Sequence, residues 1–258
     1  MSRRPLSTLF YALLLSILLP SIASAVSLPA MIDQAGFQRM LTQRMVKAYA
    51  QILTDIDQVV AQEQLEEAVS LFGQRLVLLE QQAPNEEART SLARVEQLWN
   101  VFEPIASGPV NQAGMERLLD IDDKLLGATH EVVLKLQEHS GTAPAKLVNT
   151  AGRQRMLSQR IAKLYILISG GVQNAGLSDQ LQSARYEFEG AQADLKTAPE
   201  NTQEIQQSLA EVDRQWIIFR ASFQLSEGKY VPFLVARAAE KIFKQMNQVT
   251  AMYEQVNQ

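Results

Sequence analysis

The sequence contains no cysteine and only two histidines. The absence of cysteine excludes disulfide bonds, thiol catalysis and lipoprotein attachment through a cysteine. His130 and His139 lie nine positions apart without a further histidine nearby, so no zinc site is expected. We interpret both as exposed histidines near the end of a helix, where a positive charge is favoured. The sequence therefore predicts neither a metal site nor a cofactor.

Long hydrophobic runs are missing after the first 25 residues. That first segment has two early arginines, an apolar run from Leu9 to Leu19 and the small-residue ending Ala23-Ser24-Ala25, which is the layout of a secretory signal peptide. The run is shorter than the roughly 20 residues that a membrane-spanning helix needs. We predict export to the periplasm with cleavage after Ala25. An uncleaved N-terminal membrane anchor is the competing interpretation.

Positive charge is also in short supply. Without residues 1–25, which carry two arginines and no acids, 22 basic side chains face 28 acidic ones, a formal charge of −6. A chain of this sign is a poor partner for nucleic acid, so no nucleic acid binding is expected.

Strand signals are absent, and apolar residues recur at three and four positions, which predicts an all-α protein. Segments with Pro, Gly, Ser and Asn divide the chain into eight expected helices, and Asn85 is expected to cap the third. Their approximate ranges are 31–60, 62–82, 86–104, 111–138, 146–169, 178–197, 201–223 and 230–256.

The two halves of the chain are copies of each other. IDQAGFQRMLTQRMVKAY, from residue 32, aligns with VNTAGRQRMLSQRIAKLY, from residue 148, with ten identities in eighteen positions. The third and fourth expected helices also correspond, at an offset of 117. We predict two tandem antiparallel four-helix bundles, over residues 30–138 and 146–258, that form a pseudo-dimer within one chain. A homodimer of two chains is the alternative.

Most of the remaining apolar signal is interpreted as packing. Aromatic pairs three positions apart on one helix face are typical of a bundle core, and methionines fill irregular gaps there. This interpretation covers Trp99, Phe102, Trp216, Phe219, Met40, Met45 and Met156.

The repeated motif places small residues, an arginine and an amide on one helix face. In the first copy these are Gly36, Arg39 and Gln43, and in the second Gly152, Arg155 and Gln159. A glycine inside a helix costs about 1 kcal/mol relative to alanine, so close approach of another helix backbone is the expected compensation.

If the two motif helices pack about a local twofold axis, Arg39 and Arg155 come together. Two guanidinium groups about 5 Å apart repel by roughly 3 kcal/mol at an effective dielectric of about 20, unless an anion lies between them. Guanidinium forks suit a small oxyanion held from both sides. Ordinary salt bridges are the competing interpretation for this pair. Arg44 and Arg160 point elsewhere on helix geometry, and we expect them to pair with acids of neighbouring helices.

The segment AGRQRMLSQRIAKLY resembles the signature of the PilJ/NarX-like sensor domain family, found in periplasmic parts of nitrate- and nitrite-sensing kinases and of some chemoreceptors. Its first-helix motif, the P-box, runs Ala-Gly, two variable residues, Arg-Met, a few polar residues and Arg. The matching positions here are Ala35, Gly36, Arg39, Met40 and Arg44, and again Ala151, Gly152, Arg155, Met156 and Arg160.

The resemblance implies four-helix bundles that dimerise and hold a ligand between the two first helices. Carried over to this chain, Arg39 and Arg155 form the anion clamp, and Gly36 and Gly152 let the helices meet. Arg44, Arg160, Gln43, Gln159 and Arg153 would support the site. Nitrate or nitrite is the expected ligand.

The chain also departs from the family pattern. Gln34 and Thr150 stand where a basic residue commonly precedes Ala-Gly, which lowers the positive charge around the anion. Phe37 against Arg153 breaks the symmetry of the repeats. No membrane-spanning output helix, kinase or methyl-accepting coiled coil is recognised, so the protein is expected to act through a membrane sensor kinase, chemoreceptor or transporter.

Three classes of function remain. The favoured one is a secreted periplasmic protein that binds or senses a small anion. The alternative is a structural or protein-interaction module, an accessory of a chemoreceptor or pilus system, without a small-molecule ligand. An enzyme is not expected, because no acid/base pair, nucleophile constellation or phosphate-binding loop is visible.

Overall fold

A computed structural model of the chain describes residues 27–172, 174–225 and 229–255. Every regular element within them is an α-helix, which confirms the predicted class. The helices are α1 (Leu28–Leu53), α2 (Gln58–Gln82), α3 (Glu86–Ala106), α4 (Gln112–Ser140), α5 (Ala143–Ser169), α6 (Leu177–Lys196), α7 (Gln203–Ser222) and α8 (Pro232–Gln255).

The predicted signal peptide, residues 1–25, lies outside the described residues. Among the residues that are described, no helix combines the length and the apolar character that a membrane crossing requires.

The predicted helix ends agree with the observed ones within four residues, with one exception. α1 ends at Leu53, not near residue 60. Asp55 and Asp57 follow it with left-handed φ angles of 57° and 51°, a conformation that aspartate tolerates but a right-handed helix cannot contain. The chain therefore turns before α2. The predicted cap is present: the Asn85 side chain accepts a hydrogen bond from the backbone N–H of Ala88 at 2.8 Å.

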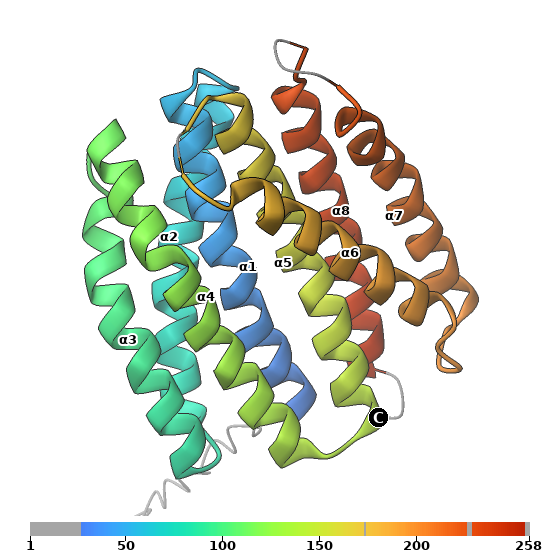
Figure 1. Cartoon of the computed structure of the whole chain (residues 1–258). Helices are drawn as coiled ribbons and strands as arrows, with labels where there is room; N and C mark the ends of the chain where they lie inside the picture. Colours follow the sequence, from blue (N-terminus) through green and yellow to red (C-terminus); the bar gives the residue numbers. More distant parts are fainter. Residues whose placement is uncertain (1–26, 173, 226–228, 256–258) are drawn as a thin grey trace, which may run out of the picture.

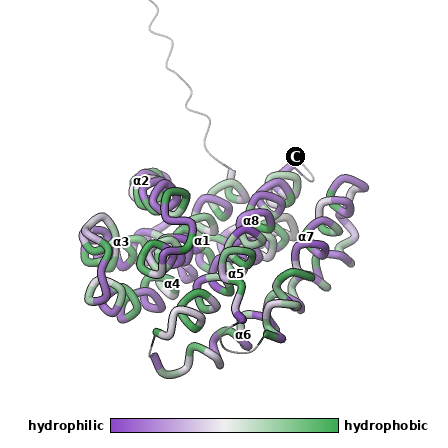
Figure 2. Tube along the Cα trace, turned by 90° about the horizontal axis from the view of Figure 1, so that it is seen from above, coloured by the Kyte–Doolittle hydropathy of each residue, from purple (hydrophilic) through white to green (hydrophobic). Residues whose placement is uncertain are grey.

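The first helices of the two repeats, α1 and α5, lie side by side at the centre of the molecule (Figure 1). α1 also packs against α2 and α4, and α5 packs against α6 and α8, while α3 contacts α4 and α7 contacts α8. Each repeat is thus a four-helix bundle, and the two bundles join along α1 and α5 as a pseudo-dimer. Seen from above, α3 and α7 lie at opposite ends of the molecule (Figure 2).

The core confirms the packing role predicted for the aromatic residues. Trp99 stacks on Phe72 with ring centroids 4.2 Å apart, and Trp216 stacks on Phe188 at 4.3 Å. Phe102, Phe219 and the three methionines of the prediction are buried as well. Each repeat therefore has its own aromatic cluster, and in the second repeat Tyr165 of α5 joins it through Phe223.

The central pair of helices buries polar side chains along with apolar ones. α1 is buried without interruption from Ala35 to Gln51, because α2, α4 and α5 surround it. Four fully buried cations lie on the pair: Arg39, Lys47, Arg155 and Lys163. Buried cations are costly without partners, so their surroundings are the first place to look for function.

Candidate anion-binding site between α1 and α5

Two buried arginines converge over the two motif glycines. A Cβ built on Gly36 would lie 3.3 Å from Nη2 of Arg39 and 3.6 Å from Nη2 of Arg155. A Cβ built on Gly152 would lie 3.1 Å from Nη2 of Arg155 and 3.5 Å from Nη2 of Arg39. Both guanidinium groups therefore occupy one small region between the helices, as the twofold argument predicted.

The expected reason for the glycines needs a correction. We predicted that they admit the backbone of the opposite helix, yet the nearest atoms over each glycine belong to the arginine side chains. Gly36 and Gly152 instead leave room for the guanidinium groups, each of which starts one helical turn later.

Arg39 forms hydrogen bonds with one side chain from the second repeat and one from its own. Its Nη2 donates to Oδ1 of Asn149 on α5 at 2.8 Å, and its Nη1 lies 3.0 Å from Nδ1 of His130 on α4. Burial and the nearby Arg39 lower the pKa of His130 to about 4. The ring is therefore neutral near pH 7, and its Nδ1 accepts a hydrogen bond from Nη1 of Arg39.

Arg155 has the equivalent neighbours, one from its own repeat and one from the first repeat. Its Nη1 donates to Oδ1 of Asn247 on α8 at 2.8 Å, and its Nη2 forms an ion pair with Asp33 on α1. In the repeat alignment Asp33 corresponds to Asn149, and His130 corresponds to Asn247. The two arginines thus have matched pairs of partners, with one difference in charge: Asp33 is a carboxylate and Asn149 is not.

These partners were not predicted from the sequence, and the position of His130 was predicted wrongly. His130 is half-buried in α4, well before that helix ends at Ser140, and not exposed near its end as predicted, because its ring faces Arg39 of α1. His139 is exposed in the last turn, as expected. The signal that could have found the partners was the repeat itself: polar residues at equivalent positions beside the motif, Asp33 with Asn149 and His130 with Asn247.

Arg39 and Arg155 together carry more positive charge than their bonded partners neutralise. Burial, and then the charge of Arg155, lower the pKa of Arg39 to about 9, with Asp33 opposing the shift. The Nε atoms of both Arg39 and Arg155 are buried and have no hydrogen-bond partner. A buried donor without an acceptor is unfavourable by about 1–3 kcal/mol. An additional anion would relieve both effects.

A second carboxyl group lies beside Asp33. Burial and the charge of Asp33 raise the pKa of Glu254 on α8 to about 7, while Arg155 opposes the shift. The pair formed by Asp33 and Glu254 therefore retains a proton up to a higher pH than two isolated carboxyl groups would.

The two motif glutamines do not reach the arginine pair. Nε2 of Gln43 donates to Asp122 of α4 at 2.7 Å, and Nε2 of Gln159 donates to the backbone oxygen of Ala239 at 3.2 Å. Asp122 is itself buried and forms an ion pair with Lys163 of α5. These groups lie along the same helix pair and fix how the repeats pack.

Arg44 and Arg160 pair with acids of neighbouring helices. Arg44 contacts Glu67 and Glu240, each at 3.1 Å, and Arg160 contacts Asp123 at 3.0 Å. Glu240 and Asp123 each belong to the other repeat. The second motif arginines thus join the two bundles and do not face the region between Arg39 and Arg155.

Arg153 and Phe37 occupy equivalent positions with different effects. The Arg155 guanidinium carbon lies 5.2 Å from the centroid of the Phe37 ring. Arg153, 2.7 Å from Glu187, instead lines a pocket that also contains Arg39. The third positive group predicted on one side is present. On that side the motif arginine Arg39 lines a pocket, whereas Arg155 does not line the larger groove that contains Phe37.

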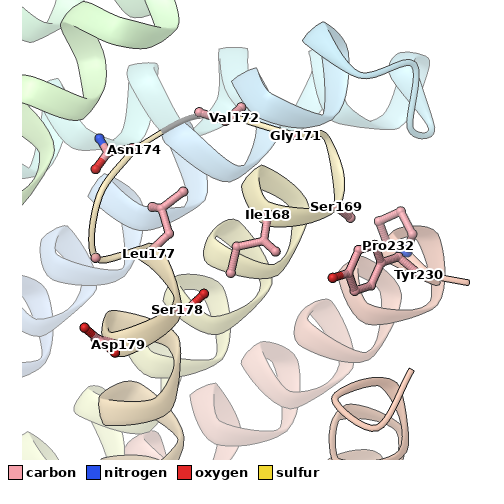
Figure 3. Close-up of a pocket in the computed structure, with 11 residues that line it drawn as sticks. Ile168, Ser169, Gly171, Val172, Asn174, Leu177, Ser178, Asp179, Tyr230 and Pro232 are labelled. Atoms are coloured by element: carbon pink, nitrogen blue, oxygen red, sulfur yellow. The ribbon is translucent and has the colours of Figure 1, made fainter. Parts of the chain in front are cut away.

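Another pocket of the described structure is less suited to an anion. A pocket of about 750 Å³ lies at the turn between α5 and α6, near the start of α8 (Figure 3). Asp179, Asn174 and Tyr230 are among its lining residues, none of which carries a positive charge. Within the described residues, no group of three or more His, Asp or Glu side chains is arranged to hold a metal ion.

Comparison with known proteins places both repeats in one family. The family model described as type IV pili methyl-accepting chemotaxis transducer N-term matches residues 22–121 and matches again over residues 139–238. Each range contains one copy of the glycine and arginine motif. No curated protein and no solved structure matches the chain significantly.

Proposed function

Since the chain belongs to the family of type IV pili methyl-accepting chemotaxis transducer N-terminal domains, we propose that its two copies form a sensor for one small oxyanion. The anion binds between α1 and α5, held by Arg39 and Arg155. Domains of this family are sensory, not enzymatic, and are typically periplasmic. Export through residues 1–25 belongs to the same proposal.

One observation carries the proposal: two fully buried guanidinium groups meet over two glycines, and each retains a buried Nε without an acceptor. A pair of like charges in this position is unfavourable alone and favourable around an anion. Nitrate and nitrite fit the demand, because they are small, planar and singly charged and accept hydrogen bonds in the plane of a guanidinium fork.

Asp33 gives the site a built-in competitor. Its carboxylate already neutralises part of the charge on Arg155, so an incoming anion exchanges with Asp33 or shares Arg155 with it. Displacement of Asp33 from Arg155 would alter the contact between α1 and α5. We propose that this change is what a separate membrane sensor, chemoreceptor or transporter detects.

The test is calorimetric titration of the protein with nitrate and nitrite. We expect saturable binding that is lost in Arg39→Lys and Arg155→Lys, since lysine keeps the charge but not the fork. Arg214→Ala, which removes an exposed arginine of α7, is the matched control and should bind as the unaltered protein does. Equal heats in the two lysine variants and the unaltered protein would remove the proposed site.

A second candidate is a protein-interaction module without a ligand. It is favoured by the partners already present, because Asn149, His130, Asn247 and Asp33 occupy the Nη atoms of both arginines. It predicts no thermal shift with any small anion. Mass measurement in solution separates the self-contained arrangement, a monomer, from a homodimer.

A further inference from the structure

A pocket of about 290 Å³ opens beside Arg39 on the side away from Phe37. It is lined by residues of α4, α5 and α6 and by Arg39 of α1, and so lies between the two repeats. Three arginines, His130 and two carboxylates line it together with an apolar patch. Its volume is near the lower end of the range for small-molecule sites and far larger than nitrate requires.

The equivalent groove in the other half is chemically different. It lies between α1, α2 and α8, and Phe37 and Phe243 meet there edge to face with centroids 5.7 Å apart. Arg155 does not line that groove, whereas Arg39 lines the pocket beside it. The motif arginine therefore lines the adjacent pocket in one half of the duplicated site and not in the other.

The charges of the pocket leave one positive charge in excess. Arg153 pairs with Glu187 at 2.7 Å, and Arg160 pairs with Asp123 at 3.0 Å. The third arginine, Arg39, contacts only neutral groups among its hydrogen-bond partners. A ligand with a single negative charge balances the pocket, whereas a dianion would leave charge uncompensated.

Two hydrogen-bond donors are available for that charge. Nε of Arg39 is buried without an acceptor. Because Nδ1 of His130 accepts a hydrogen bond from Arg39, the neutral ring carries its own proton on Nε2, for which the described structure provides no acceptor. Together they can hold the two oxygens of a carboxylate.

Apart from Gln180 and Ser183, the rest of the pocket is apolar. Leu126, Met156, Leu157 and Ala184 contribute to its lining, and Gly127 contributes backbone without a side chain. We infer that this pocket binds an organic monocarboxylate with a compact apolar body, its carboxylate at Arg39 and His130 and its body against Leu126 and Met156. Benzoate and hexanoate are ligands of this class.

The inference goes beyond the oxyanion site but shares Arg39 with it. A carboxylate at Arg39 is expected to reduce nitrate affinity, since both anions use the same guanidinium group. Arg155 and Asp33 belong to the oxyanion site alone, and Gly127 and Met156 belong to the pocket alone. The two sites can therefore be tested separately.

The experiment is titration of the full chain with benzoate, hexanoate and the neutral benzyl alcohol. We expect saturable binding of the two acids and at least tenfold weaker binding of the alcohol. Gly127→Leu fills the pocket from its rim, and a Cβ at this exposed helical position meets no atom within 4 Å, so the fold should be retained. We expect it to weaken benzoate binding at least tenfold and to leave nitrate binding unchanged.

Gly190→Leu on α6 is the matched control, because a Cβ there also meets nothing within 4 Å and the residue does not line the pocket. It should bind benzoate as the unaltered protein does. Absence of benzoate and hexanoate binding, or equal benzoate binding in Gly127→Leu and Gly190→Leu, overturns the inference. Loss of nitrate binding in Arg155→Lys with benzoate binding retained supports both sites, while benzoate binding without any nitrate binding removes only the oxyanion proposal.

Discussion

At the scale of single residues, Asp33 determines how much positive charge the arginine pair presents. It is the carboxylate that forms an ion pair with Arg155, and the equivalent residue of the second repeat is the neutral Asn149. The chain thus carries a natural comparison between a charged and a neutral partner for the same arginine fork. Exchanging the two residue types changes charge with little change in shape.

We expect Asp33→Asn to increase nitrate affinity about tenfold, which corresponds to about 1.4 kcal/mol, because a competing negative charge is removed. Calorimetric titration measures the change. The reverse exchange, Asn149→Asp, adds a second internal counter-ion and should weaken binding by a similar factor. Lower nitrate affinity in Asp33→Asn than in the unaltered protein would contradict the competing role of Asp33.

The lowered pKa of His130 predicts that the free energy of unfolding depends on pH. Burial, Arg39 and Arg153 lower its pKa from 6.5 to about 4, so the folded protein holds the neutral ring. Between these values the unfolded chain binds more protons, and stability is lost as the pH falls from 6.5 towards 4. For a half-buried ring we expect a loss of about 1–2 kcal/mol after allowance for screening.

His130→Asn places at this position the residue that faces Arg155 in the other repeat. The variant should lack the acid-side loss, as measured by urea unfolding at several pH values between 4 and 7. Glu254 acts in the opposite sense, because its raised pKa of about 7 makes stability fall as the pH rises from 4.5. Because the unaltered protein and His130→Asn both keep Glu254, the difference between their pH profiles of stability reports on His130 alone. Parallel pH profiles would contradict the prediction.

At the scale of helices, the two motif glycines set the distance between the guanidinium groups and the helix backbone. Gly36→Ala with Gly152→Ala puts methyl groups 3.3 and 3.1 Å from arginine nitrogens, tighter than ordinary contact. Alanine gains about 1 kcal/mol of helix propensity at each position, and the crowding offsets it. We expect nitrate binding to be lost with little net change in unfolding free energy.

The control is Gly190→Ala, where the new methyl group meets nothing within 4 Å. It should stabilise the protein by about 1 kcal/mol, the full gain in helix propensity, and leave nitrate binding unchanged. A doubly substituted motif variant that binds nitrate normally would show that the space over the glycines is not part of the site.

Periodicity and breakers predicted the eight helices because amphipathic patterns and caps act locally. The end of α1 escaped prediction, since Asp55 and Asp57 adopt a left-handed backbone that no apolar pattern signals. The repeat predicted that Arg39 meets Arg155, because twofold packing of identical helices brings equivalent residues together. It did not predict Asp33 as counter-ion or His130 as acceptor, because these contacts depend on how side chains of three helices meet.

At the scale of the whole molecule, buried ion pairs cross from one repeat to the other. Lys47 of α1 contacts Glu240 of α8 at 2.5 Å, and Lys163 of α5 pairs with Asp122 of α4. Separation of the bundles would break these pairs and expose the polar faces of α1 and α5. The repeats should therefore unfold as one unit, unlike two domains on a flexible linker.

Each repeat contains a single tryptophan, Trp99 or Trp216, which reports on its own bundle. In Trp216→Phe the fluorescence follows the first repeat, and in Trp99→Phe it follows the second. We expect the fluorescence midpoint in urea to coincide with the circular dichroism midpoint in each variant.

Asp122→Ala, which introduces the residue found at the equivalent position 239, leaves Lys163 buried without its partner and should cost about 3–5 kcal/mol. Both tryptophans should report that loss together, although Trp216 lies in the other repeat. Separate midpoints for the two tryptophans would instead mean that the bundles are independent and that a site between them must assemble anew each time they meet.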